Sequence, residues 1–329
     1  MTPPTAVGID IGGTKIAAGL VDRDGLIGGL QVVPTGAQAG GRLVLKRAID
    51  LARSVRDRAP AGAQAAAVGI AAAGWIDSAS GRVVAATDLL PGWVGLELQA
   101  AFERELGLPG AAVNDVQAMG VAEGRLGGGR GCRVCLTVAV GTGIGGGITI
   151  DGRLLSGAHG FAGAIGHIPW RQGGPKCSCG QQGCIEAEAS GPAVARAFDA
   201  CLRRGPDPGA SGSAPSTLED VVRAFGAQDR QIRECASRVT RTAGRRLGRV
   251  LGGLVNTLDP DVVVLGGGAA IALGERFLAA IGAGTRESAL PVMDPVVVSS
   301  RLGAAAGVVG AGLLALDWVG ETVDRPIMR

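Results

Sequence analysis

The 329-residue sequence is 47% hydrophobic and 19% charged, with 32 Lys and Arg against 29 Asp and Glu. This composition argues against a disordered chain, and the net charge of +3 argues against a surface built for nucleic acid. No apolar run is expected to cross a bilayer, and the start MTPPTAVGIDIGG lacks the features of a secretory signal. We therefore expect a cytoplasmic protein, and two domains because the length exceeds one usual hydrophobic core.

The first third predicts an α/β order of elements. Three short strands are expected within residues 6–35, joined by turns at Gly12-Gly13 and Asp24-Gly25. Helical spacing of apolar residues follows over 41–59, then a buried strand over 64–74, a helix over 96–107 and a strand over 110–116. The order is three strands, helix, strand, helix, strand.

The second half begins in the same way, after a helix over 116–127. Residues 132–157 predict strand, glycine turn, strand and strand, which indicates a duplicated unit. A Pro/Gly/Ser-rich stretch, Arg203–Thr217, predicts a surface loop, with a domain linker as the alternative. The remaining expected elements are a long helix ending at Pro260, strands over 261–268 and 295–301, and a final apolar helix over 304–316.

Two glycine-rich turns are candidate phosphate-binding loops. The first, DIGGTK, supplies backbone N–H groups together with Asp10, Gly12, Gly13, Thr14 and Lys15. An ordinary hairpin turn is the alternative for this motif taken alone. VGTGIGGG, residues 140–147, repeats the arrangement, and two such loops could hold the two ends of a triphosphate.

The second turn also matches the dinucleotide fingerprint G-x-G-x-x-G at Gly141, Gly143 and Gly146. That fingerprint requires a helix directly after the glycines, whereas a strand pattern follows here. A nicotinamide-dependent oxidoreductase is therefore disfavoured.

Asp115 follows a predicted buried strand and begins a helix, where an α/β fold opens its cleft. A helix N-cap is the alternative role for an Asp at this position. A kinase that phosphorylates an alcohol needs a carboxylate to accept the hydroxyl proton, and Asp115 suits that task. Asn114 beside it could bind a polyol substrate.

One histidine and three cysteines lie within residues 167–184, at His167, Cys177, Cys179 and Cys184. One imidazole and three thiolates suit a closed tetrahedral Zn²⁺ site, which is the structural rather than the catalytic type. Clustered cysteines in a reducing compartment more often bind metal than form disulfides. Cys132 and Cys135, by contrast, lie in a strand pattern and are expected to pack as apolar residues.

The sequence resembles the ROK family of bacterial sugar kinases along nearly the whole chain. The motifs that carry this resemblance occur in the family's order: GIDIGGTK, GIAAAG, VNDVQA, GTGIGGG, CSCGQQGCIE and LGGG. The resemblance implies an actin-like ATPase fold of two similar ribonuclease-H-like domains, with sugar and Mg²⁺-ATP in the cleft between them. The expected domains are residues 1–116 with about 305–329, and residues 117–304.

The resemblance also implies roles for individual residues. Asp115 would be the catalytic base, and Asp10 would lie near the metal and the transferred phosphate. The acceptor would be bound by Gly74, Asn114, His167 and Glu186. The nucleotide would be held by the first turn and by two further glycine segments: Gly141, Thr142 and Gly143, and Gly266, Gly267 and Gly268.

One position departs from the family's glucokinases. They read G-E-x-G-H before the cysteines, whereas this chain has GAIGH with Ala164 in place of the sugar-binding Glu. Losing a carboxylate contact weakens discrimination between acceptors. Glucokinase is the first expectation, with N-acylmannosamine kinase, which shares N-D-x-Q-A, and a C7-cyclitol kinase as alternatives.

A sugar-responsive repressor of the same family is the alternative from another class. It is disfavoured because the first phosphate loop begins near residue 10, which leaves no room for a DNA-binding segment. We expect small-molecule partners only, no nucleic acid or membrane, and a homodimer or homotetramer. The choice between ATP and polyphosphate as donor is open.

Overall fold

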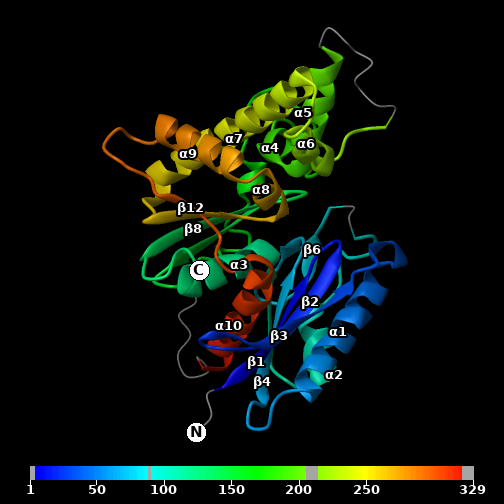
Figure 1. The fold of residues 1–329 in the computed structure, drawn as a ribbon. Helices are drawn as coiled ribbons and strands as arrows, with labels where there is room; N and C mark the ends of the chain where they lie inside the picture. The colour runs from blue at the N-terminus through cyan, green and yellow to red at the C-terminus, as the bar shows by residue number, and fades with distance from the viewer. Residues whose placement is uncertain (1–3, 88–89, 205–213, 321–329) are drawn as a thin grey trace. The chain divides into compact units, whose positions relative to one another are not determined.

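In the computed structural model, which describes residues 4–87, 90–204 and 214–320, the chain forms two compact units (Figure 1). The first unit comprises Met1–Thr137, Gly147–Gly163 and Arg301–Arg329, and the second comprises Val138–Gly146 and Ala164–Ser300. The predicted loop Arg203–Thr217 falls largely on residues 205–213, which lie outside the described residues.

The first unit is built on a five-stranded sheet of order β3-β2-β1-β4-β7. β1 is antiparallel to β2 and parallel to β4, and β4 is parallel to β7. The elements of this part of the chain are β1 (Thr5–Ile11), β2 (Lys15–Asp22), β3 (Gly25–Pro34), η1 (Ala37–Ala39), α1 (Gly41–Asp57), β4 (Ala65–Ala72), β5 (Trp75–Ile76), β6 (Val83–Ala85), α2 (Leu98–Leu106), β7 (Gly110–Asn114) and α3 (Asp115–Leu126).

A second sheet has the order β10-β9-β8-β11-β12. Counted from the first strand of each set, both sheets have the order third, second, first, fourth, fifth, which confirms the predicted duplication. The remaining elements are β8 (Val134–Val140), β9 (Ile144–Ile150), β10 (Arg153–Leu154), η2 (Ile165–His167), α4 (Glu186–Ala189), α5 (Gly191–Arg203), α6 (Leu218–Ala224), α7 (Arg230–Leu258), β11 (Val262–Gly266), α8 (Gly268–Leu273), α9 (Glu275–Ser288), β12 (Val297–Ser299), η4 (Gly303–Ala305) and α10 (Ala306–Gly320).

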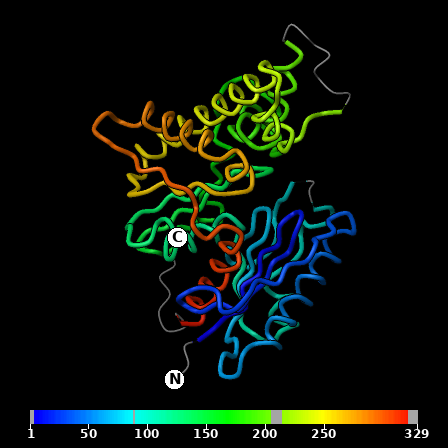
Figure 2. Tube along the Cα trace, in the orientation of Figure 1, coloured from blue at the N-terminus to red at the C-terminus, as the bar shows by residue number. Residues whose placement is uncertain are grey.

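The C-terminal helix α10 returns to the sheet of the first unit, beside β1, β4 and α3, as the red segment of Figure 2 shows. Glycines allow this close approach. A Cβ atom at Gly8 or Gly69 would overlap a backbone carbonyl oxygen of α10, at Val308 or Ala311 respectively. The helix thus completes the core of a unit whose first strand lies some 300 residues earlier.

α10 also corrects one expectation from the sequence. Together with η4 it forms Gly303–Gly320, which by length and composition is apolar enough to span a membrane, with a mean hydropathy of 1.5. It is the one such helix among the described residues, and 56% of it is buried inside the protein. That burial is typical of a core helix in a globular fold.

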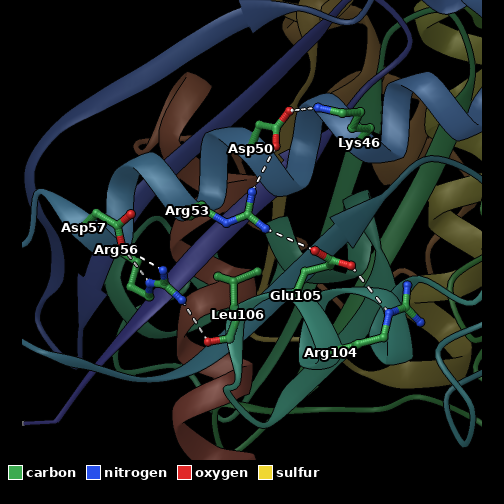
Figure 3. Close-up of polar contacts among 8 residues, drawn as sticks. All are labelled: Lys46, Asp50, Arg53, Arg56, Asp57, Arg104, Glu105 and Leu106. Carbon is green, nitrogen blue, oxygen red and sulfur yellow. Dashed lines mark hydrogen bonds and ion pairs between the residues drawn. The ribbon is translucent and has the colours of Figure 1, made fainter.

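The other face of the first sheet is covered by α1, whose apolar side chains reach the core through Val44, Ala48 and Val55. Polar contacts then join α1 to α2 (Figure 3). Arg53 pairs with Glu105 at 3.1 Å, and the Arg56 guanidinium donates to the carbonyl of Leu106 at 2.9 Å. Exposed pairs of this kind contribute little stability individually, so the apolar face of α1 fixes the packing.

Candidate functional site

Two carboxylates in the first unit have strongly perturbed acidity. Burial raises the pKa of Asp115 to about 6. Burial also raises the pKa of Asp10 to about 7, with a further increase from the negative charge of Asp115 and a partial decrease from Lys15. Such values are typical of carboxylates that exchange protons or bind cations.

The first glycine turn lies between β1 and β2 and is held by backbone contacts. The N–H of Gly12 donates to the carbonyl of Lys15 at 3.0 Å, and the buried Thr35 hydroxyl donates to the carbonyl of Gly12 at 2.7 Å. Thr14 and Lys15 themselves are exposed. The turn is therefore rigid, and its polar side chains are free to meet a ligand.

At the start of α3, the residue that caps the helix is not Asp115. Asn114 Oδ1 accepts hydrogen bonds from the N–H groups of Val116, at 2.9 Å, and Gln117, at 3.3 Å. Its Nδ2 donates to the carbonyl of Gly74 at 2.9 Å, which ties the turn after β4 to α3. Asn114, rather than Asp115, is thus the N-cap, although Asp115 Oδ1 also accepts the N–H of Val116 at 2.9 Å.

In the second unit, the other two glycine segments adjoin one another. Gly267 has φ +89°, and a Cβ atom there would lie 2.5 Å from the carbonyl oxygen of Val140. The N–H of Gly141 donates to the carbonyl of Gly143 at 2.9 Å, closing the turn after β8. Gly267 therefore packs directly against the end of β8, where the predicted nucleotide turn 141–143 begins.

The structure also brings the four predicted metal ligands together. One ligand atom from each of His167, Cys177, Cys179 and Cys184 lies within 4.8 Å of all the others. Cys179 Sγ lies 3.7 Å from Cys184 Sγ, and Cys177 Sγ lies 3.6 Å from His167 Nδ1. Zn–S bonds of about 2.3 Å in a tetrahedron place the sulfurs about 3.8 Å apart, so the spacing fits Zn²⁺.

Glu186 connects this cysteine loop to the glycine turn. Its Oε1 accepts from the hydroxyl of Ser178 at 2.9 Å, and its Oε2 accepts from the N–H of Ile144 at 2.9 Å. A Cβ atom at Gly143 would lie 2.7 Å from Oε2, so only glycine fits there without displacing the carboxylate. Glu186 thus already contacts the turn that is predicted to hold phosphate.

A buried carboxylate that the sequence reasoning missed supports the same loop. Glu188 is 8% exposed and pairs with Arg171 Nε at 2.6 Å and with Arg246 of α7. The proximity of Arg171 and Glu188 to the cysteines was the only available signal.

Two of the remaining cysteines contradict the expectation of reduced thiols. Cys201 of α5 and Cys235 of α7 form a disulfide, although 34 residues separate them. The spacing gave no indication of this pair, because facing positions on two helices are set by tertiary packing. Cys135 is buried in β8 as expected, whereas Cys132 precedes the strand and is half-buried.

The predicted site residues therefore form two groups. Asp10, the first glycine turn, Gly74, Asn114 and Asp115 belong to the first unit, and the second unit holds the others. Each group is assembled from segments distant in sequence.

The whole chain can be compared with known proteins. A family model described as ROK family matches residues 6–318. Curated relatives include the glucokinase of Streptomyces coelicolor, 33% identical over 94% of this chain and 97% of its own, and the N-acetylmannosamine kinase of Escherichia coli O9:H4, 35% identical over 94% and 98%. A Streptomyces griseus ROK glucokinase solved with glucose and AMPPNP is 31% identical, with a TM-score of 0.81 over 95% of this chain and 99% of that one.

The fold is thus the two-domain, actin-like ATPase fold of sugar kinases. The chain belongs to the ROK family. The domain limits predicted from the sequence stay a prediction.

Proposed function

We propose that this protein is a sugar kinase that transfers the γ-phosphoryl group of Mg²⁺-ATP to the primary hydroxyl of a hexose, with glucose as the first candidate. Asp115 accepts the hydroxyl proton while the sugar oxygen bonds to the γ-phosphorus and the bond from phosphorus to the bridging oxygen breaks, releasing ADP. The backbone N–H groups of the glycine turns would hold the phosphates, and the Asp10 carboxylate would attract the Mg²⁺ ion, whose positive charge would neutralise the phosphate oxygens.

The observation that carries this proposal is that Asn114 and Asp115, at the start of α3, have different roles. Asn114 accepts hydrogen bonds from the N–H groups of both Val116 and Gln117, so the helix has its cap without Asp115, whose Oδ1 shares only the N–H of Val116. Burial raises the pKa of Asp115 to about 6, so it is mostly ionised at neutral pH yet remains basic enough to take a proton. The relatives named as glucokinase and N-acetylmannosamine kinase support the same reaction class.

The acceptor is the least constrained part of the proposal, because Ala164 supplies no carboxylate. We expect weaker preference for glucose than in a glucokinase with Glu there, and N-acylmannosamine or a C7 cyclitol are the alternative acceptors. ADP release should be measured with glucose, mannose, N-acetylmannosamine and a C7 cyclitol, using ATP and polyphosphate as donors. No turnover with any pair would contradict the kinase assignment.

Zn²⁺ bound by His167 and the three clustered cysteines would have a structural role. Four protein ligands leave no coordination position for water, so the ion would cross-link the loop and take no part in the transfer. The donor set supports this, because the four ligand atoms lie within 4.8 Å of one another. By the resemblance to the family, Gly74, Asn114, His167 and Glu186 are proposed to bind the acceptor.

A cytoplasmic location and a homodimer or homotetramer complete the proposal. Light scattering coupled to size-exclusion chromatography tests the assembly. A monomer at micromolar concentration would contradict it.

A further inference from the structure

Gln117 joins the first turn of α3 to a separate loop of the first unit. Its side chain is 3% exposed. Nε2 donates to the carbonyl of Gly160 at 2.9 Å and to the carbonyl of Ala162 at 3.0 Å. Oε1 accepts from the N–H of Asn114 at 3.4 Å, completing a capping box. Both ends of the amide are therefore used.

The loop over residues 157–163 is confined on its other side as well. Gly160 has φ +82°, and a Cβ atom there would lie 2.7 Å from the carbonyl oxygen of Ile76 and 2.9 Å from the nitrogen of Ser78. The loop belongs to no strand or helix, so its carbonyl groups are not fixed by a ladder of backbone bonds. Two local backbone bonds hold it, from the N–H of Ala162 to the carbonyl of Ser156 at 3.0 Å and from the N–H of Gly160 to the carbonyl of Gly157 at 3.4 Å. Gln117 adds two bonds from one side chain and connects the loop to α3.

Asp115 lies between the two residues that hold these loops. On one side in sequence, Asn114 binds the carbonyl of Gly74, and on the other, Gln117 binds the carbonyls of Gly160 and Ala162. Residue 163 is followed directly by Ala164, the position at which the family resemblance implies an acceptor-binding Glu in glucokinases. The first turn of α3 thus carries the proposed base together with the two side chains that bind these loops.

We propose that Gln117 is a positioning residue that sets the loop over residues 157–163 relative to Asp115 and thereby selects among sugar acceptors. This inference rests on the proposed sugar kinase function. Gln117 itself transfers no proton and contacts the acceptor only through the loop. A small displacement of an acceptor hydroxyl from the base is costly to the reaction, which is why a buried amide can affect selectivity.

The test is the isosteric variant Gln117→Glu. It keeps Oε1 as acceptor for the Asn114 N–H but replaces the Nε2 donor by an oxygen that faces two carbonyl oxygens. Gln117→Asn keeps the amide and shortens its reach by about 1.5 Å. For both variants we expect the KM of the best acceptor to rise by about tenfold or more, the ratio of kcat/KM between two acceptors to change by about fivefold, and the KM for ATP to stay within about twofold.

Thr5→Val is the matched control. Thr5 is 1% exposed in β1 of the same unit, and its hydroxyl donates to the carbonyl of Ala63 at 3.2 Å. This variant also loses a buried hydrogen bond, so its melting temperature should fall, but its acceptor ratio should equal that of the wild type.

Hydrogen–deuterium exchange supplies a readout that is independent of activity. Exchange at residues 157–163 should increase in Gln117→Glu and Gln117→Asn and not in Thr5→Val. An active wild type whose acceptor ratio and loop exchange are unchanged in the Gln117 variants would overturn this inference alone. A wild type inactive with every acceptor would overturn the proposed function, and unchanged exchange in the variants would then overturn the loop-positioning role as well.

Discussion

Asp115 and Asn114 are adjacent, yet their side chains have different tasks, and one substitution tests the difference. Asp115→Asn is nearly isosteric and still forms hydrogen bonds, but it cannot accept the hydroxyl proton. We expect kcat to fall by about a hundredfold or more, with little change in nucleotide affinity and no decrease in melting temperature. Steady-state kinetics, nucleotide titration and calorimetry measure the three quantities. Near-normal turnover would remove Asp115 from the mechanism.

The two carboxyl groups of raised pKa, Asp10 and Asp115, predict how stability depends on pH. The pKa values of Asp10 and Asp115, about 7 and about 6, both exceed the value of 3.8 for an ordinary Asp. Between about pH 4 and pH 7 the folded protein therefore binds more protons than the unfolded chain, so the free energy of unfolding decreases as pH rises. Asp10→Asn removes part of this dependence.

Calorimetry at pH 5 and pH 8 without Mg²⁺ or nucleotide tests this. The melting temperature of Asp10→Asn relative to the wild type should be higher at pH 8 than at pH 5 by a few degrees, since the wild type alone loses stability as Asp10 ionises. Asp77→Asn is the control, because the hydroxyl of Ser80 lowers the pKa of Asp77, and its ionisation is complete by pH 5. An equal response in both variants would contradict the assignment.

At the scale of elements, the cysteine loop contains little regular secondary structure, so we expect its conformation to depend on cross-links. Between η2 and α4, residues 168–185 form only isolated bridges, such as Pro169 to Cys184 and Lys176 to Gln182. Burial raises the pKa of Cys184 to about 12, so its thiolate requires a compensating cation. We expect about one zinc per chain, and we expect a chelator to lower stability and activity together.

Cys179→Ser should behave as a folding variant, with lower zinc content and a lower melting temperature. Cys132→Ser is the matched control, because Cys132 is a half-buried free cysteine outside the cluster. Elemental analysis with thermal denaturation distinguishes them. A metal-free wild type of full stability and activity would eliminate the zinc site.

Local signals made most of these elements predictable. Gly107, with φ +68°, ends α2 where the sequence indicated, and Asp259, with φ +45°, ends α7 just before the predicted stop at Pro260. The cysteine cluster was predictable because its four ligands lie within 18 residues. The cap at Asn114 was missed because either residue of the pair Asn-Asp can cap a helix, and only backbone dihedral angles decide which one does.

Contacts between distant segments were not predictable in this way. Gln117 meets Gly160 across 43 residues, and Cys201 of α5 meets Cys235 of α7 across 34 residues. Neither pair carries a periodic pattern or a fixed spacing. Their positions follow from how whole elements pack, which a single sequence does not specify locally.

For the whole molecule, duplication explains why two glycine turns occupy equivalent places. Each turn joins the first and second strand of a sheet with the same strand order, β1 to β2 and β8 to β9. The chain passes between the two units at residues 137/138, 146/147, 163/164 and 300/301. After the last crossing the chain forms α10, which belongs to the first unit. How firmly the crossing is held should therefore affect the stability of the core that α10 shares with the N-terminal strands.

Glu123 anchors the chain directly after this crossing. It is fully buried in α3, and its carboxylate accepts from the N–H groups of Arg301, at 3.1 Å, Leu302, at 2.9 Å, and Gly128, at 2.9 Å. One residue earlier, the N–H of Ser300 donates to the carbonyl of Leu265 in the second unit at 2.7 Å. The crossing is therefore held on both sides within two residues.

Glu123→Gln keeps the shape of the side chain but turns one oxygen into an NH₂ group that faces backbone donors. We expect the free energy of unfolding to fall by about 2–4 kcal/mol, because buried N–H groups lose a charged acceptor. Hydrogen exchange in α10 should increase, since the segment that leads into this helix is released.

Glu103→Gln is the control for this last prediction. Oε1 of Glu103 also accepts a backbone N–H, from Gly110 at 2.9 Å, but at a half-buried position within the first unit. Water can replace part of that contact, so its loss should cost less than about 1 kcal/mol and leave exchange in α10 unchanged. Chemical denaturation with exchange measurements compares the two variants. An equal loss in both would mean that the crossing at residue 300/301 needs no special anchor.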